Sequence, residues 1–461
     1  MRKYIGDRQF YYHALRLTIP MMVQNAISNL VGLLDNLMIG RLGTNEMSGV
    51  SIANQFLFIF NLLIFGATAG VGIFTAQYHG MKDEEGVRNT FRFKVVINVI
   101  LTILAVILFV IFGNTLIGTF LHGEGAISDA ARTLEIGRGY LYIMLAGLIP
   151  YAIGMAYSGT LRETGETAVP MKASMAAVFI NLTGNFILIY GYFGLPAMGA
   201  KGAAIATVIS RGAELMILAV YTKKHSSVHT FIKDAYRHLF IPGDLAGKYF
   251  IKSLPLMCNE VLWAAGITFL SQSYSYRSLN AVAALNIQST LWNLLGVAFI
   301  AMGEGVGIII GQILGKGDIE KAKGDAIRLI ALTVFLGLVF GIIQICLGPL
   351  FPRLYNTSAE VKDMARRLIM IMGVMMPVIA YTHASYFVIR AGGRVGITML
   401  FDSCFTWVVY VPTAFFLSRY TDIDIVLMFA AVQSLELLKA LLGGIMVHSG
   451  IWARNIVKQS S

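Results

Sequence analysis

Apolar residues dominate twelve stretches of the chain, and a short polar segment separates each stretch from the next. A helix needs about 20 mostly apolar residues to cross a bilayer. Stretches of this kind lie at 14–39, 49–78, 93–116, 135–160, 168–191, 201–222, 249–274, 281–314, 326–348, 363–388, 395–418 and 424–447. The pattern therefore predicts an all-α integral membrane protein with twelve transmembrane helices. An even number of spans places both termini on the same side of the membrane.

The sequence contains an internal repeat. A shift of 235 residues aligns GVGIFTAQYHGMKDEE (70–85) with GVGIIIGQILGKGDIE (305–320), and half of these positions are identical. The same shift aligns Pro20 with Pro255. We therefore expect two pseudo-symmetric six-helix bundles around a central cleft, a design typical of secondary transporters. The predicted limits are a first lobe at 1–222, a cytoplasmic linker at 223–247 and a second lobe at 248–461.

Basic residues gather in alternate loops. The loops on the side of the termini hold most of the 36 lysines and arginines. Those of the first half are Arg2, Lys3, Arg8, Arg16, Lys82, Arg88, Arg92, Lys94, Arg162 and Lys172. The positive-inside rule assigns this side to the cytoplasm, so we expect both termini there and the protein in the cell membrane. The net charge of +11 is then a topology signal and not a nucleic-acid footprint.

The composition agrees with the membrane assignment. The chain is 56% apolar and 13% charged, whereas soluble domains have about 25% charged residues. This excludes a soluble enzyme, a secreted domain and a nucleic-acid binder. Three cysteines, Cys258, Cys346 and Cys404, are too scattered to suggest a disulfide framework or a metal site.

Motif searches add little. The chain has no HExxH or GxSxG motif and no phosphate loop ending in GKS or GKT, so we expect neither catalysis nor a cofactor. His225 and His229 in the linker have the four-residue spacing of a metal-binding pair on a helix. We favour the alternative of a solvated linker face.

Polar residues inside the first-half spans are candidates for function. A charge at mid-bilayer costs about 2.5–3.5 kcal/mol on insertion scales. Asp35 lies on a polar face of the first span, although it can also be a residue near the outer end that reaches water. The other candidates are Asn181, Asn185, Thr207, Arg211 and Glu214. Carboxylate, amide and hydroxyl oxygens suit a cation or proton site, whereas asparagines also simply join helices.

Arg211 and Glu214 are three residues apart, so we favour a structural ion pair between them over contact with a substrate. In the second half, the candidate acids are Glu260, close after Pro255, and Asp402. A structural hydrogen bond is the alternative for Glu260. Glu436 and Lys439 are at pairing distance on one helix, and we expect them to neutralise each other.

Several stretches resemble the multidrug and toxic compound extrusion (MATE) family. They are LTIPMMVQNAISNLVGLLDNLMIGRLG (17–43), the two GVG segments, NLTGNFILIYG (181–191), KGAAIATVIS (201–210) and IRAGGRVGITMLFD (389–402). They occur in the family's order and span nearly the whole chain. The resemblance implies two six-helix bundles that form a V-shaped cleft and antiport of H+ or Na+ against organic, often cationic drugs.

The resemblance also maps the family's amino-terminal cation site onto Asp35, Asn181, Asn185 and Thr207. Some members have an acid where this chain has Asn185. One sodium-coupled branch has an acid near the position of Arg394, and Glu260 lies closer to Pro255 than that branch's acid does to its proline. The resemblance therefore leaves the carboxy-terminal ion site open.

We therefore predict a secondary antiporter that exports amphipathic drugs or toxic compounds in exchange for H+ or Na+. Its partners are drug-like small molecules and the lipid bilayer, with no nucleic acid, and we expect a monomer. The alternative is a flippase for lipid-linked saccharides or polar lipids, which needs a strongly basic cavity. Arg211 is the one clearly intramembrane basic residue in this interpretation, which disfavours a flippase. No cluster or loop motif of a membrane enzyme or a channel is evident.

Overall fold

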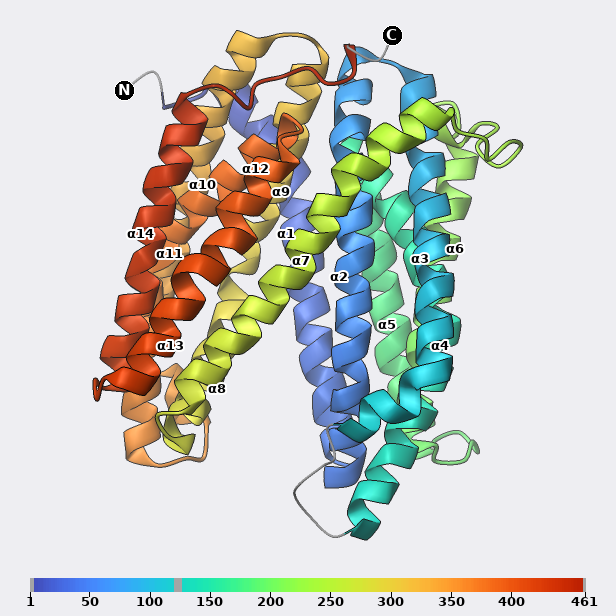
Figure 1. The fold of residues 1–461 in the computed structure, drawn as a ribbon. Coiled ribbons are helices and arrows are strands. Elements are labelled where there is room, and N and C mark those ends of the chain that lie inside the picture. The colour runs from blue at the N-terminus through green and yellow to red at the C-terminus, as the bar shows by residue number, and fades with distance from the viewer. Residues whose placement is uncertain (1–3, 120–126, 459–461) are drawn as a thin grey trace. The chain divides into compact units, whose positions relative to one another are not determined.

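The computed structural model describes residues 4–119 and 127–458, and these residues form helices joined by short loops (Figure 1). The first half contains α1 (Arg8–Gly40), α2 (Thr44–Met81), α3 (Glu84–Thr119), α4 (Ile127–Glu163), α5 (Ala168–Tyr190) and α6 (Gly199–Lys224). The second half contains α7 (Gly243–Ser275), α8 (Leu279–Leu295), α9 (Val297–Gly315), α10 (Ile319–Leu347), α11 (Ala359–Ala391), α12 (Val395–Met399), α13 (Val411–Tyr420) and α14 (Ile425–His448). In the described ranges, twelve helical segments are long and apolar enough to span a membrane, which confirms the predicted all-α class.

Two predicted spans are less regular than expected. The span at 281–314 divides into α8 and α9 at Gly296, where a Cβ would lie 2.9 Å from the carbonyl oxygen of Trp292. The last-but-one span runs through Val395–Tyr420, and its middle consists of two π-helical stretches, Leu400–Cys404 and Thr406–Tyr410. Neither irregularity interrupts the hydrophobic pattern, so hydropathy alone does not detect them.

The helices form two compact units. The α9–α14 unit contains Met1–Ala26, Ala76–Lys82 and Cys258–Ser461, and the α3–α6 unit contains Ile27–Thr75 and Asp83–Met257. Consequently α1 and α7 each start in one unit and end in the other. The transition from one unit to the other comes shortly after Pro20 in α1 and Pro255 in α7. These are the two prolines that the repeat aligns. The lobe limits at 222 and 248 stay a prediction.

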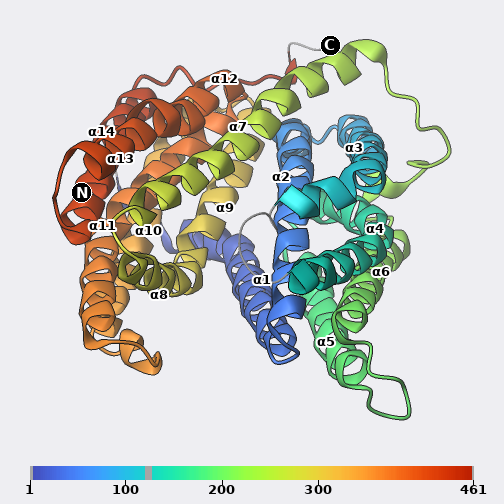
Figure 2. The same ribbon diagram turned by 60° about the horizontal axis from the view of Figure 1, so that its bottom comes forward.

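Each unit has its own apolar core. In the α3–α6 unit, α6 packs along α4 and α5, and α3 packs along α4 (Figure 2). Its core includes Phe60, Leu141, Ile189 and Ala204. In the α9–α14 unit, α11 contacts α9, α10 and α14, and the core includes Leu17, Met302, Leu329 and Val388. Many large apolar side chains face outward instead, as expected of helices in contact with lipid.

The segment between α6 and α7 is packed against α3. Arg92 donates to the carbonyl oxygens of Asp234 at 2.7 Å and Ala235 at 3.0 Å. A short 3-10 helix, Thr230–Ile232, places Phe231 against Phe91, with ring centres 5.1 Å apart. The segment therefore has its own apolar contacts and is not only a polar connection.

The two linker histidines have different environments. His225 is exposed and stacks on Tyr221, with ring centres 4.3 Å apart, whereas His229 is buried. The interpretation of both as one solvated face is therefore wrong for His229, because the segment folds back on α3. Burial lowers the pKa of His229 from its ordinary value, against the opposing effect of the Glu166 carboxylate.

Candidate functional site

Four polar side chains from three helices meet inside the α3–α6 unit. Asp35 comes from α1, Asn181 and Asn185 come from α5, and Thr207 comes from α6. Asn185 Nδ2 donates to Asp35 Oδ1 at 2.6 Å, and the two asparagine amides lie 3.2 Å apart. The Thr207 hydroxyl is 3.1 Å from the Asn181 amide. The structure therefore brings together the four residues that were predicted to form a cation or proton site.

The hydrogen-bonding neighbours orient the Asn181 amide. When its nitrogen faces Asp35, that nitrogen is 3.1 Å from Oδ1, and its oxygen accepts from Thr207 at 3.1 Å. Both asparagines are buried, and Asn185 Oδ1 has no hydrogen-bond partner within the described ranges. The cluster thus presents a carboxylate and an unsatisfied amide oxygen, which are ligand types that hard cations prefer.

Charged and aromatic side chains lie next to this cluster. Arg211 Nη1 is 3.8 Å from Glu214 Oε2, so the expected ion pair is present. The guanidinium also stacks over the Tyr151 ring at 4.6 Å, and its charge acts on Asp35. Tyr140, which is buried, donates to Asn54 Oδ1 at 3.3 Å. Asp35 is therefore not an isolated acid but part of a mixed polar and aromatic environment.

The second-half candidates belong to the α9–α14 unit. Asp402 Oδ1 accepts from Lys439 Nζ at 2.9 Å, and Asp402 Oδ2 accepts from Asn259 Nδ2 at 3.1 Å. Glu260 lies next to Asn259 in the sequence of α7. The charged groups that act on Glu260 include Asp402 and Arg390. Asp402 and Glu260 therefore share one charged region, and Asp402 has a basic partner there.

The predicted pairing of Glu436 with Lys439 is wrong. Glu436 accepts hydrogen bonds from the hydroxyls of Thr382 and Tyr410, and Lys439 bonds to Asp402 instead. Spacing along one helix made the pair geometrically possible, but the packing of α11 and the π-helical span against α14 supplies better partners to both residues.

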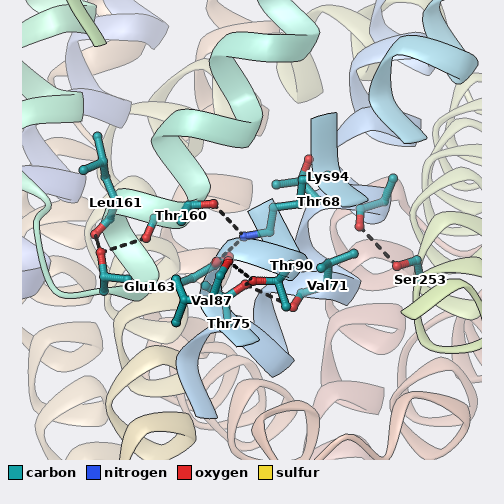
Figure 3. A network of polar contacts seen from close by, with 12 residues as sticks. Thr68, Val71, Thr75, Val87, Thr90, Lys94, Thr160, Leu161, Glu163 and Ser253 are labelled. Atoms are coloured by element: carbon teal, nitrogen blue, oxygen red, sulfur yellow. Dashed lines mark hydrogen bonds and ion pairs between the residues drawn. The ribbon is translucent and has the colours of Figure 1, made fainter. Parts of the chain in front are cut away.

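A third polar cluster escaped the sequence analysis. Lys94 in α3 forms an ion pair with Glu163 at the end of α4, and Lys94 Nζ is also 3.2 Å from Thr160 Oγ1 (Figure 3). Lys94 is fully buried, although it was assigned to a cytoplasmic loop with the topology-setting residues. One helical turn further on, Asn98 Nδ2 donates to the Thr68 hydroxyl at 3.0 Å. The assignment of Lys94 to a loop is therefore wrong.

A signal for this cluster was present in the sequence. Lys94, Asn98 and Thr102 recur every four residues and therefore line one face of α3. All three have no exposed surface. Glu163 lies far away along the chain, and its position beside this face follows only from the packing of α4 on α3.

Comparisons with known proteins identify a family and several relatives of this chain. The sequence profile of the family described as MatE matches residues 20–187 and 256–416. The chain is 22% identical over 450 residues to the probable multidrug resistance protein NorM of Thermotoga maritima, covering 96% of this chain and 93% of that one. It is 26% identical over 419 residues to the probable multidrug resistance protein YoeA of Bacillus subtilis, covering 88% and 87%.

Solved structures show the same fold. One is described as the outward-facing conformation of a multidrug resistance MATE family transporter of the MOP superfamily. It superimposes with a TM-score of 0.84 at 18% sequence identity, over 97% of this chain and 98% of that chain.

Proposed function

Because the chain belongs to the multidrug and toxic compound extrusion (MATE) family, we propose that it is a secondary antiporter for organic, often cationic drugs or toxic compounds. The exchanged ion is H+ or Na+. The family consists of transporters and not of enzymes. The names of the curated relatives, which are probable multidrug resistance proteins, support efflux as the direction of substrate movement.

The observation that carries the proposal is the contact between Asp35 and Asn185. A carboxylate from α1 meets two buried amides from α5, and Asn185 Oδ1 lacks a partner in the part of the chain that the structure describes. We assign this cluster, with Thr207 beside Asn181, as the binding position of the exchanged ion. A charged residue in a membrane helix is costly, so its retention beside such ligands supports a role in transport.

The mechanism follows from linkage between two ligands. An ion that occupies Asp35 favours one state of the transporter, and a substrate favours the other. The positive charge of Arg211 acts on the Asp35 carboxylate and favours its ionised form. Antiport then requires that ion and substrate not stabilise the same state.

The orientation and assembly remain as the sequence predicts them. We propose a monomer in the cell membrane, with both termini in the cytoplasm, because the basic loops follow the positive-inside rule. The start of α1 and the C-terminal segment lie at the same end of the α9–α14 unit (Figure 1), which is consistent with an even number of spans.

Basic residues other than Arg211 bear on the flippase alternative. Arg211 is not the one basic residue within the helices, because Lys94 and Arg390 are buried there and Lys439 is nearly so. However, Lys94 pairs with Glu163, and Lys439 pairs with Asp402. Lys94 and Lys439 are therefore neutralised by acids and do not contribute to the basic cavity that a lipid phosphate requires.

Purified protein in liposomes tests the proposal. A fluorescent organic cation is followed while an H+ or a Na+ gradient is imposed, and each gradient is then collapsed with an ionophore. We expect substrate movement that one of the two gradients drives and that stops when this gradient collapses. Movement of a labelled polar lipid without substrate movement under either gradient would instead support the flippase.

A further inference from the structure

Lys439 reaches Asp402 from α14. Its ammonium group is 2.9 Å from Asp402 Oδ1 and 5.4 Å from the centre of the Phe401 ring. The exposed fractions of the two side chains are 11% for Lys439 and 19% for Asp402. Asn259 Nδ2 donates to the other carboxylate oxygen. Lys439 therefore occupies the position at which a free cation would bind this carboxylate and the aromatic face beside it.

The backbone around Asp402 is unusual. Asp402 lies in the first of two consecutive π-helical stretches, a conformation that is rare and often found at functional sites. Ser403 donates to Asn259 Oδ1 through its backbone nitrogen at 3.3 Å and through its hydroxyl at 2.7 Å. These bonds fix the Asn259 amide, so that its nitrogen must face Asp402. The carboxylate therefore has a second hydrogen-bond donor besides Lys439.

The nearest alternative partner of Lys439 is occupied. Glu436, one turn earlier in α14, accepts from Thr382 and Tyr410. Other charged groups that act on this region are Arg390, Glu260 and Glu436. The ion pair that Lys439 forms is nevertheless with Asp402.

We infer that Lys439 is a tethered cation that fills the cation position of Asp402, so that this carboxylate exchanges neither H+ nor Na+ during transport. The inference extends the proposed function, since it excludes one second-half acid from ion coupling. It also defines a latent binding site. Without the lysine side chain, the carboxylate and the Phe401 ring form a position for a small primary alkylammonium ion.

Chemical rescue of the full-length protein in detergent tests the latent site directly. Lys439→Ala leaves the largely buried Asp402 carboxylate without its basic partner, which is destabilising. We expect millimolar propylammonium to raise the melting temperature of Lys439→Ala by several degrees, because a ligand that binds the folded state stabilises it. Tetramethylammonium, which has no N–H donor, should do so much less. The wild type and the double variant Asp402→Asn/Lys439→Ala should not respond.

Equal effects of propylammonium on all three proteins would overturn the inference. Lys439→Arg, which keeps the charge, controls for folding. If Lys439→Ala does not fold, transport by the double variant Asp402→Asn/Lys439→Met tests the inference instead, because this variant removes both charges together. In liposomes it should keep the ion-to-substrate ratio of the wild type, and a changed ratio would contradict the inference. The rescue experiment needs no transport, so it stays informative even if the proposed antiport fails.

Discussion

Gly80 at the end of α2 lies directly against the backbone of Gln312 in α9, and Gly315 lies in the same way against the backbone of Gln77. Both contacts belong to the α9–α14 unit. The repeat aligns Gln77 with Gln312 and Gly80 with Gly315. The two copies therefore meet through a reciprocal contact, which explains why both keep glycine at this position. A Cβ on either glycine would overlap the opposite backbone.

This contact predicts that larger residues are not tolerated there. Gly80→Val and Gly315→Val should each lower the melting temperature of the purified protein, because overpacking costs about 1–3 kcal/mol. Gly324→Ala in α10 is the matched control, since a Cβ there has no neighbour within 4 Å. The control should be as stable as the wild type or slightly more stable. A Gly80→Val protein with unchanged melting temperature would contradict the reciprocal contact.

The Lys94–Glu163 pair predicts strongly non-additive variants. Lys94→Met alone leaves the Glu163 carboxylate without its basic partner, and Glu163→Gln alone leaves the Lys94 ammonium group without its acidic partner. Each substitution should destabilise the protein by about 3–5 kcal/mol, because it leaves an uncompensated buried charge. The double variant should recover most of this loss, since both charges are then absent. Thermal unfolding of the four proteins measures the coupling. Additive effects of the two substitutions would show that the buried pair is not energetically coupled.

The linker contacts predict a local effect of Arg92. Arg92→Ala removes the donors to the carbonyl oxygens of Asp234 and Ala235. We expect faster hydrogen exchange in residues 230–237 and unchanged exchange in the core of α5. Lys172→Ala, which changes an exposed basic residue near the start of α5, serves as the control. Unchanged exchange in 230–237 would mean that these hydrogen bonds do not hold the linker on α3.

The burial of His229 predicts a pH-dependent linker. Burial lowers the pKa of His229 in the packed linker, whereas an unpacked linker has the ordinary value of about 6.5. The unpacked form therefore binds protons more readily, so packing weakens as the pH falls below about 6.5 and is unaffected well above it. Hydrogen exchange of the linker, corrected for intrinsic rates, should therefore become faster as the pH falls below about 6.5.

His229→Asn should abolish the pH dependence of linker exchange, and His225→Asn, which alters the exposed histidine, should keep it. The same pH profile in wild type and His229→Asn would exclude His229 as the responsible group.

Hydropathy predicted the twelve spans because a membrane helix must satisfy a length and composition requirement that is local in sequence. The cluster of Asp35 with Asn181, Asn185 and Thr207 was also predicted, from polar spacing and from the family resemblance. The structure shows that these side chains touch.

The partners of buried basic residues were not predictable in the same way. Lys439 has an acid three residues earlier, yet its partner is Asp402 on another helix. Lys94 lies close to the loop basic residues in sequence, yet its partner is Glu163, 69 residues later. In both cases, tertiary packing decides between acids that sequence spacing cannot distinguish. The π-helical turns around Asp402 are equally invisible to a pattern of apolar positions.

The most direct test of the central claim is the transport of a fluorescent organic cation by Asp35→Asn in liposomes with the driving ion gradient. Asparagine keeps the size of the side chain and removes its charge. We expect gradient-driven transport to fall to the level of protein-free liposomes, while the melting temperature stays near that of the wild type. Glu214→Gln, which changes a nearby acid outside the cluster, should retain gradient-driven transport. Full transport by Asp35→Asn would contradict the assignment of Asp35 as the ion-binding carboxylate.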